Sequence, residues 1–162
     1  MDRLFLDANV LFSAAHRPSA GLLRFWNLKN VILCSSHYAL EEARINLSDD
    51  TQRGRLARLA RKIQLFDSTA RQLPAGISLP EKDRPILLAA MDARTTHLIT
   101  GDLRHFGPYF GKKIEGILIV TPFQYLKTHS PMTCHPGSIC AIVETKRRQG
   151  SKSSTTKIRT MD

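Results

Sequence analysis

The sequence contains 162 residues, the length of a single domain, and 42% of them are hydrophobic, which is enough to form a core. Its 24 Lys and Arg against 14 Asp and Glu give a formal charge of +10, which favours a polyanionic partner, RNA or DNA, over a membrane. The absence of a membrane span, of a signal-peptide core and of paired cysteine spacing argues against a membrane or secreted protein and predicts a cytoplasmic one.

The N-terminal half is predicted to alternate short buried strands with amphipathic helices. Apolar runs predict strands at 3–6 and 31–34, and apolar residues at helical spacing predict helices at 9–15, 20–27, 38–47 and 51–63. The last of these helices is strongly basic, with Arg53, Arg55, Arg58, Arg61 and Lys62 around its apolar positions. These side chains form either a solvated face or a flank that contacts phosphate groups.

The C-terminal half continues the same alternation. We predict strands at 64–66, 96–100 and 117–120, a connection at 67–80, a helix opened by residues 82–85, a loop or short turn at 103–109 and a short helix at 123–126. Strands that alternate with helices predict βαβ units and an α/β fold with a parallel sheet. Entirely apolar strands, such as the one at 117–120, are typical of a sheet that is covered on both faces.

The composition changes after Lys127. Residues 128–162 are rich in Ser, Thr, Lys and Arg, and their one apolar patch, at 138–143, could form a strand. Six basic and two acidic residues give this segment +4 of the total charge and leave +6 for residues 1–127. We therefore predict a basic folded domain at 1–127, followed by a low-order, disordered extension at 128–162.

Four acidic residues lie where ligands bind in an open α/β sheet, beyond the carboxyl ends of the strands. Asp7 ends the first predicted strand, and Asp102 follows the strand at 96–100. Asp83 opens the helix that leads into that strand, and Glu42 lies in the helix after the second strand. Carboxylates gathered in one cleft raise each other's pKa unless a cation is present, and oxygen-only ligands indicate Mg²⁺ or Mn²⁺. An acidic metal pocket on a basic protein is typical of a phosphodiesterase that acts on nucleic acid.

The residues around these acids resemble the four acidic motifs of the PIN domain family. They read LDANVL at 6–11, ALEEA at 39–43, EKDRPILLAA at 81–90 and LITGD at 98–102. The similarity covers about residues 1–127 and is greatest to stand-alone prokaryotic PIN proteins, including the toxin components of toxin–antitoxin pairs. It implies a three-layer α/β/α fold with a central parallel sheet and a metal-dependent endoribonuclease activity.

The resemblance also implies roles for individual residues. It assigns metal binding and catalysis to four acids, Asp7, Glu42, Asp83 and Asp102. It gives supporting roles to Asn9 and Thr100, which would orient a carboxylate or a water on the metal. Glu41 stays open as an alternative to Glu42, although the motif favours Glu42. Three basic residues near the motifs are candidate substrate contacts: Arg84, Arg104 and His105.

The cofactor implied is Mg²⁺ (or Mn²⁺), and the partners implied are RNA, a small antitoxin protein and a second copy of the chain. One alternative is a catalytically silent PIN scaffold that binds RNA or a partner protein; the four intact acids argue against it. Another is a phosphoryl-transfer enzyme with Asp7 as covalent acceptor. That chemistry needs a second acid nearby and a Lys after a later strand, whereas position 9 is Asn.

Overall fold

The computed structural model describes residues 1–18, 20–69 and 71–129. Its first half contains β1 (Asp2–Leu6), α1 (Ala8–His16), α2 (Ala20–Leu23), the 3₁₀ helix η1 (Arg24–Asn27), β2 (Val31–Ser35), α3 (His37–Asn46), α4 (Asp50–Ala60) and β3 (Gln64–Leu65). Its second half contains α5 (Arg84–Asp92), β4 (His97–Ile99), the 3₁₀ helix η2 (Gly107–Tyr109), β5 (Lys113–Ile114), β6 (Ile117–Val120) and α6 (Pro122–Thr128).

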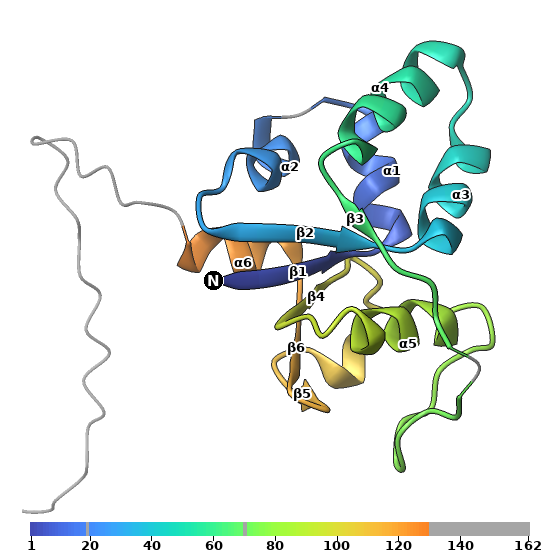
Figure 1. Ribbon diagram of the computed structural model, residues 1–162, viewed down its shortest axis with the longest axis vertical. Coiled ribbons are helices and arrows are strands. Elements are labelled where there is room, and N and C mark those ends of the chain that lie inside the picture. Colours follow the sequence, from blue (N-terminus) through green and yellow to red (C-terminus); the bar gives the residue numbers. More distant parts are fainter. Residues whose placement is uncertain (19, 70, 130–162) are drawn as a thin grey trace, which may run out of the picture. The chain divides into compact units, whose positions relative to one another are not determined.

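The strands form one six-stranded sheet in the order β3-β2-β1-β4-β6-β5. From β1 the chain moves outward through β2 to β3, and it then returns past β1 to β4. Right-handed crossovers in opposite directions place their helices on opposite faces of the sheet. Figure 1 shows this arrangement, with α1, α3 and α4 on one side of β1 and β2 and α5 on the other. The chain therefore has the predicted α/β/α layers, and its topological switch point lies between β1 and β4.

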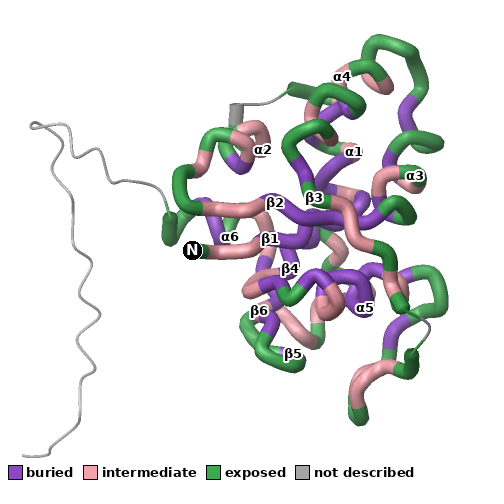
Figure 2. The backbone as a smooth tube through the Cα atoms, viewed as in Figure 1, coloured by how far each residue is buried: buried purple, intermediate pink, exposed green. Residues whose placement is uncertain are grey.

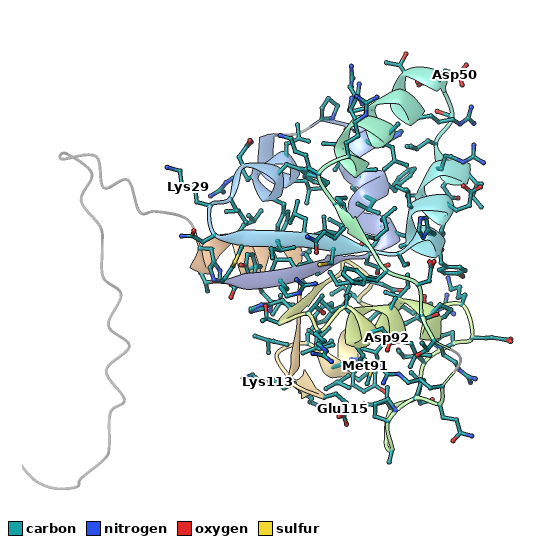
Figure 3. The ribbon with its side chains drawn as sticks, in the orientation of Figure 1. Lys29, Asp50, Met91, Asp92, Lys113 and Glu115 are labelled. Atoms are coloured by element: carbon teal, nitrogen blue, oxygen red, sulfur yellow. The ribbon has the colours of Figure 1, made fainter. Side chains whose placement is uncertain are left out.

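The sheet differs from the prediction at one edge. The edge strand β5 pairs with β6 in the antiparallel direction, whereas the other five strands are parallel to one another. The two strands are joined at Glu115 and Gly116, which have positive φ angles of 48° and 85°. Lys113 and Glu115 mark this hairpin in Figure 3. A strand of two residues is too short to show an alternating pattern, so the sequence contained no periodic signal for β5.

One predicted helix is also corrected: the helix predicted at 20–27 is a single α-turn that continues as η1. The segment at 103–109, predicted as a loop or short turn, contains the short 3₁₀ helix η2. Pro108 lies in the first turn of η2, a position that suits its fixed φ angle. Short 3₁₀ segments of this kind are common connectors and have no 3.6-residue period to reveal them.

The core lies on both faces of the central strands. Leu4, Phe5 and Leu6 of β1 are completely buried, as are Leu98 and Ile99 of β4. Figure 2 shows that the buried segments run through these strands and continue into α1 and α5. A strand that is covered on both faces must be apolar at every position, and this explains the continuous apolar runs in the sequence.

Side chains fix where the helices begin. The Asp7 carboxylate accepts a hydrogen bond from the backbone N–H of Ala8 and so caps α1, and the Ser36 hydroxyl caps α3 in the same way. Thr121 and Gln124 form a capping box at the start of α6. The cap of α1 places Asp7 in the crevice between β1 and β4.

The described part of the chain continues slightly past the predicted domain boundary. Helix α6 ends at Thr128, and the Tyr125 hydroxyl on this helix donates a hydrogen bond of 2.7 Å to Asp2 of β1. The rest of the predicted extension, including the predicted strand at 138–143, lies outside the described residues. Among the described helices, none is long and apolar enough to cross a membrane.

Candidate active site

One cleft of about 410 Å³ opens at the carboxyl ends of β1 and β4, at the topological switch point. All four acids that the motifs singled out line this cleft: Asp7, Glu42, Asp83 and Asp102. They come from the ends of β1 and β4, from α3 and from the start of α5. The fold therefore brings together four residues that span 95 positions of the chain.

Asp7 is the most buried of the four acids, with only 5% of its surface exposed. Its Oδ2 accepts a 2.6 Å hydrogen bond from the Thr100 hydroxyl and a 2.8 Å hydrogen bond from the Asn9 amide, while its Oδ1 accepts from the Ala8 N–H at 2.6 Å. Charge-assisted hydrogen bonds of this length are the strong ones. They hold the carboxylate in one orientation, and the supporting roles of Asn9 and Thr100 toward a metal stay a prediction.

The same two polar residues tie α1 to the loop after β4. The Asn9 side chain accepts a 2.9 Å hydrogen bond from the Gly101 N–H, and the Thr100 hydroxyl accepts from the Asp102 N–H at 3.0 Å. A Cβ atom at position 101 would lie 3.3 Å from Asn9 Oδ1, so a side chain there would press on this contact. The glycine of the LITGD motif thus permits the close approach of α1 to the loop.

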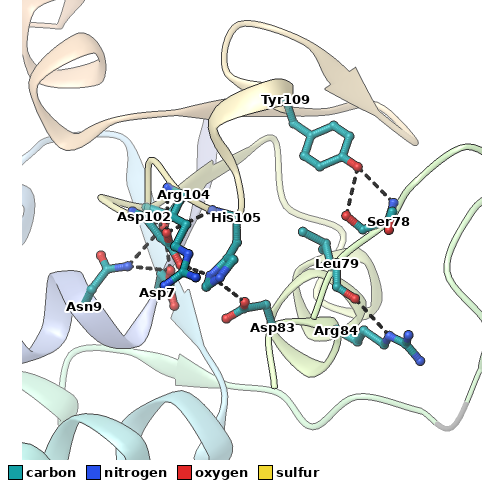
Figure 4. A network of polar contacts seen from close by, with 11 residues as sticks. Asp7, Asn9, Ser78, Leu79, Asp83, Arg84, Asp102, Arg104, His105 and Tyr109 are labelled. Atoms are coloured by element: carbon teal, nitrogen blue, oxygen red, sulfur yellow. Dashed lines mark hydrogen bonds and ion pairs between the residues drawn. The ribbon is translucent and has the colours of Figure 1, made fainter. Parts of the chain in front are cut away.

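Asp83 and Asp102 face each other across His105. His105 Nδ1 lies 2.7 Å from Asp102 Oδ2 and 3.0 Å from Asp83 Oδ2 (Figure 4). The backbone N–H groups of Arg104 and His105 donate to the other oxygen of Asp102, at 2.9 and 3.1 Å. This tight turn places Asp102 in the lining of the cleft and holds the His105 imidazole against Asp102 and Asp83, although His105 does not itself line the cleft.

The two neighbouring glutamates of α3 point in different directions. Glu42 lines the cleft, whereas Glu41 forms hydrogen bonds of 2.7 and 2.8 Å with Arg44 on the exposed side of the helix. Glu42 therefore lies in the cleft and Glu41 does not, and the role of Glu42 as the fourth acid stays a prediction. Lys82 also lines the cleft, and its positive charge lowers the pKa of both Glu42 and Asp83.

Three of the acids have raised pKa values. Burial raises the pKa of Asp7 to about 6; the hydrogen bonds from Thr100 and Ala8 oppose this rise, and the charges of Glu42 and Asp83 add to it. Burial also raises the pKa of Glu42 and Asp83, against the opposing effect of Lys82. Burial acts on Asp102 in the same direction, but its hydrogen bonds with His105 and Arg104 and the His105 charge outweigh it and lower its pKa.

These residues fit a divalent cation. Asp83 is 91% buried, yet its Oδ2 accepts no hydrogen bond, although His105 Nδ1 lies 3.0 Å away. Donor atoms of Asp83, Asp102 and His105 all lie within 4.8 Å of one another. Mutual repulsion that raises pKa values and an unsatisfied buried carboxylate oxygen are both relieved by a bound cation.

The structure does not bring every candidate residue to the cleft. The Arg84 guanidinium donates to the Leu79 carbonyl at 3.1 Å and points away from Asp83 in Figure 4, so its role toward a substrate stays a prediction without a contact to support it. Arg104 is exposed beside Asp102, and its role also stays a prediction. The basic side chain that lines the cleft is that of Lys82. Lys82 was not among the substrate contacts predicted from the sequence, although it lies only two residues before Arg84.

The basic helix α4 has a structural role at one of its arginines. The Arg55 guanidinium donates to the Ala15 and His16 carbonyls at the end of α1. Carbonyl groups at a helix C-terminus have no partners within the helix and carry a partial negative charge, so a cation there is stabilising. This contact supports packing of α4 on α1, and α4 contributes no residue to the lining of the acidic cleft.

We expect Thr100→Val to destabilise the protein by about 2–3 kcal/mol at neutral pH. Thr100 is completely buried, and valine keeps its shape but removes the donor to Asp7 and the acceptor for the Asp102 N–H. Urea unfolding of the two proteins measures the difference. Thr100→Ser is the control, because it keeps the hydroxyl and loses only a methyl group. Equal losses in both variants would show that the hydroxyl network contributes little.

A family model described as PIN domain matches residues 3–104, a range that includes all four acids. Among solved structures, VapBC2 from Rickettsia felis bound to a DNA fragment from their promoter is similar, with 16% sequence identity and a TM-score of 0.58 over 74% of this chain and 98% of that chain. VapBC-1 from nontypeable Haemophilus influenzae is similar at 14% identity and a TM-score of 0.50, over 75% of this chain and 98% of that one. At such identities these likenesses show the fold alone. No curated protein matches the sequence significantly.

Proposed function

This chain belongs to the PIN domain family, and from that premise we propose that it is a metal-dependent endoribonuclease. The observation that carries the proposal is the convergence of four acids from four separate elements in one cleft. Burial raises the pKa of two of these acids, Glu42 and Asp83, and the charges of neighbouring acids add to it: Asp83 and Asp102 act on Glu42, and Asp102 acts on Asp83. The protein has a formal charge of +10, yet four of its carboxylates lie together in one cleft. A bound divalent cation would compensate their negative charge and so explains why they lie together.

The four acids, Asp7, Glu42, Asp83 and Asp102, would hold Mg²⁺ or Mn²⁺ through oxygen atoms. When bound, such an ion lowers the pKa of a coordinated water and offsets negative charge on a phosphate during hydrolysis. Thr100 and Asn9 hold the Asp7 carboxylate in place through short hydrogen bonds. Lys82, which lines the cleft, would attract the phosphate of a substrate. The basic charge of residues 1–127 favours RNA near the cleft.

We extend the proposal to the biological role. The motifs resemble those of toxin components of toxin–antitoxin pairs, and two similar folds are those of VapBC2 and VapBC-1. On this basis we propose that the chain is a toxin, that a small antitoxin protein inhibits it, and that it pairs as a homodimer.

Cys34 is a free, buried thiol, and it fits the cytoplasmic location that we propose.

The test is cleavage of a mixed set of single-stranded and structured RNAs by the purified protein with Mg²⁺, with Mn²⁺ and with EDTA. We expect cleavage only with metal. Glu42→Gln is expected to reduce the rate on the order of 10²-fold, because it removes a charge from the cleft. Glu41→Gln is the matched control: it makes the same chemical change one residue away, on the side of α3 where Glu41 pairs with Arg44.

Two outcomes would contradict the proposal. Cleavage that continues in EDTA would remove the metal from the mechanism. RNA binding without cleavage in either metal, by protein shown to be free of an inhibitor, would favour the alternative of a silent PIN scaffold. Equal losses in Glu41→Gln and Glu42→Gln would show that the effect comes from α3 as a whole rather than from the cleft.

A further inference from the structure

His105 is held beside two acids of the cleft, Asp83 and Asp102, by the turn that follows β4. The backbone N–H groups of Arg104 and His105 fix one oxygen of Asp102, so the other oxygen, Oδ2, faces the imidazole at 2.7 Å. The next residue, Phe106, is completely buried and anchors the turn in the core. Only 19% of the His105 side chain is exposed. The imidazole is therefore preorganised beside the two carboxylates.

Hydrogen bonding alone does not satisfy the polar atoms of His105, Asp102 and Asp83. The Nδ1 atom lies 2.7 Å from Asp102 Oδ2 and 3.0 Å from Asp83 Oδ2, but it carries at most one proton. That proton serves Asp102, and the buried Oδ2 of Asp83 accepts no hydrogen bond. A polar atom in such a buried position is normally satisfied. Figure 4 shows the Asp83 carboxylate directed at the His105 imidazole.

We propose that His105 Nδ1 is a direct ligand of the divalent ion, together with Asp83 and Asp102, and that this nitrogen makes the site prefer Mn²⁺ to Mg²⁺. Ligand atoms at adjacent corners of an octahedron, each about 2.1 Å from the ion, lie roughly 3 Å apart. The distances from Nδ1 to the two carboxylates are 2.7 and 3.0 Å. An ion at this point would also satisfy Asp83 Oδ2. The inference rests on the proposed function only for the presence of a divalent ion.

The metal preference follows from the chemistry of the donor atoms. Mg²⁺ is a hard cation that binds oxygen and keeps several waters, whereas imidazole nitrogen binds transition-metal ions more strongly. A site built of four carboxylates alone would accept either ion. Exchanging one oxygen donor for His105 Nδ1 therefore weakens Mg²⁺ relative to Mn²⁺.

The test measures metal binding to the intact protein in the absence of RNA. Calorimetry with MnCl₂ and MgCl₂ gives the two affinities, and electron spin echo modulation of bound Mn²⁺ detects a directly coordinated ¹⁴N nucleus. We expect a ¹⁴N signal and tighter binding of Mn²⁺ in the wild type. His105→Gln is expected to abolish the signal and to weaken Mn²⁺ on the order of 10- to 100-fold, with a smaller effect on Mg²⁺.

His129→Gln is the matched control. His129 also pairs with a carboxylate, that of Asp2, at 3.4 Å, but it does so at the opposite end of β1. This variant should keep both the ¹⁴N signal and the preference for Mn²⁺. The wild-type spectrum alone decides the coordination, so the test stands even if His105→Gln folds poorly.

Three results would overturn the inference: Mn²⁺ bound without a ¹⁴N signal, a ¹⁴N signal that persists in His105→Gln, or no binding of either ion. The experiments can reject the nitrogen ligand and the nuclease activity independently of each other. Metal-dependent cleavage without a nitrogen ligand would reject the inference and keep the nuclease. A nitrogen-coordinated Mn²⁺ in a protein that cleaves no RNA would keep the inference and reject the nuclease.

Discussion

Replacing Asp7 with Asn is expected to reduce RNA cleavage at least about 10³-fold, equivalent to roughly 4 kcal/mol of transition-state stabilisation. Asp7 lies at the switch point and is the acid with the most hydrogen bonds to neighbouring side chains among those that line the cleft. The amide has nearly the same shape but carries no charge, so it binds a cation poorly. Initial cleavage rates at saturating Mn²⁺ measure the effect.

The same variant is expected to be more stable than the wild type at neutral pH. The pKa of Asp7 in the folded state is about 6, against an ordinary value of 3.8, so the folded protein binds this proton more tightly than the unfolded chain does. Stability that depends on Asp7 is therefore fully present below about pH 4 and is lost as the pH rises through about 6. The difference between these two pKa values of Asp7 corresponds to about 3 kcal/mol in the free energy of unfolding.

Asn at position 7 removes the loss of stability that ionisation of Asp7 causes, but it disturbs part of the hydrogen-bond network. We therefore expect the free energy of unfolding to rise by about 1–2 kcal/mol at neutral pH. Urea unfolding in EDTA at about pH 4.5 and about pH 7 measures it, and the slope between the two pH values should be smaller in the variant. Asp50→Asn is the control, because the Asp50 side chain is 98% exposed and the substitution is chemically identical. A variant that is less stable than the wild type at neutral pH would show that the hydrogen bonds of Asp7 outweigh its charge.

The placement of Asp7 and Asp102 could be predicted because both follow apolar strands. Parallel strands that are buried on both faces have a strong sequence signal, and their carboxyl ends lie at one edge of the sheet. The choice between Glu41 and Glu42 could also have been made from spacing. Ala39 and Ala43 are buried, and Glu42 is three residues from one and adjacent to the other. Glu41 lies two residues from each, on the opposite side of the helix.

The basic residue that lines the cleft, Lys82, could not be predicted in this way. Lys82 precedes the first turn of α5, in a segment of irregular turns where no periodicity relates side chains to a face. Arg84 begins the regular helix, but its guanidinium turns back to the Leu79 carbonyl. Which of the two basic residues enters the cleft depends on backbone dihedral angles in the turn, and these angles cannot be inferred from the residue types alone.

The environment of His105 needed the structure for a similar reason. A histidine three residues after an aspartate is a weak sequence signal. Its position beside Asp83 depends on the turn after β4, in which Asp102 accepts two backbone hydrogen bonds, and on a second loop 19 residues earlier that carries Asp83. Side-chain pairs between separate loops are set by the packing of the whole domain rather than by any local pattern.

Mn²⁺ is expected to stabilise the protein against unfolding, and this effect should grow as the pH rises. An ion that binds only the folded state adds about 2.7 kcal/mol when its concentration is 100 times its Kd. A cation needs ionised carboxylates, and the pKa values of Asp7, Glu42 and Asp83 are all raised, that of Asp7 to about 6. Below this value protons compete with the ion for the same oxygen atoms.

The measurement is the unfolding temperature with millimolar Mn²⁺ and with EDTA, at about pH 5 and about pH 7.5. We expect a small difference between Mn²⁺ and EDTA at the lower pH and a difference of several degrees at the higher pH. Asp7→Asn should lose most of the metal effect, because the ion loses one of its charged ligands, and Asp50→Asn should keep it. The two acid-to-amide variants therefore separate binding in the cleft from general attraction of cations to surface carboxylates. A metal effect that is equal at both pH values would mean that the ion does not bind the acids whose pKa values burial raises.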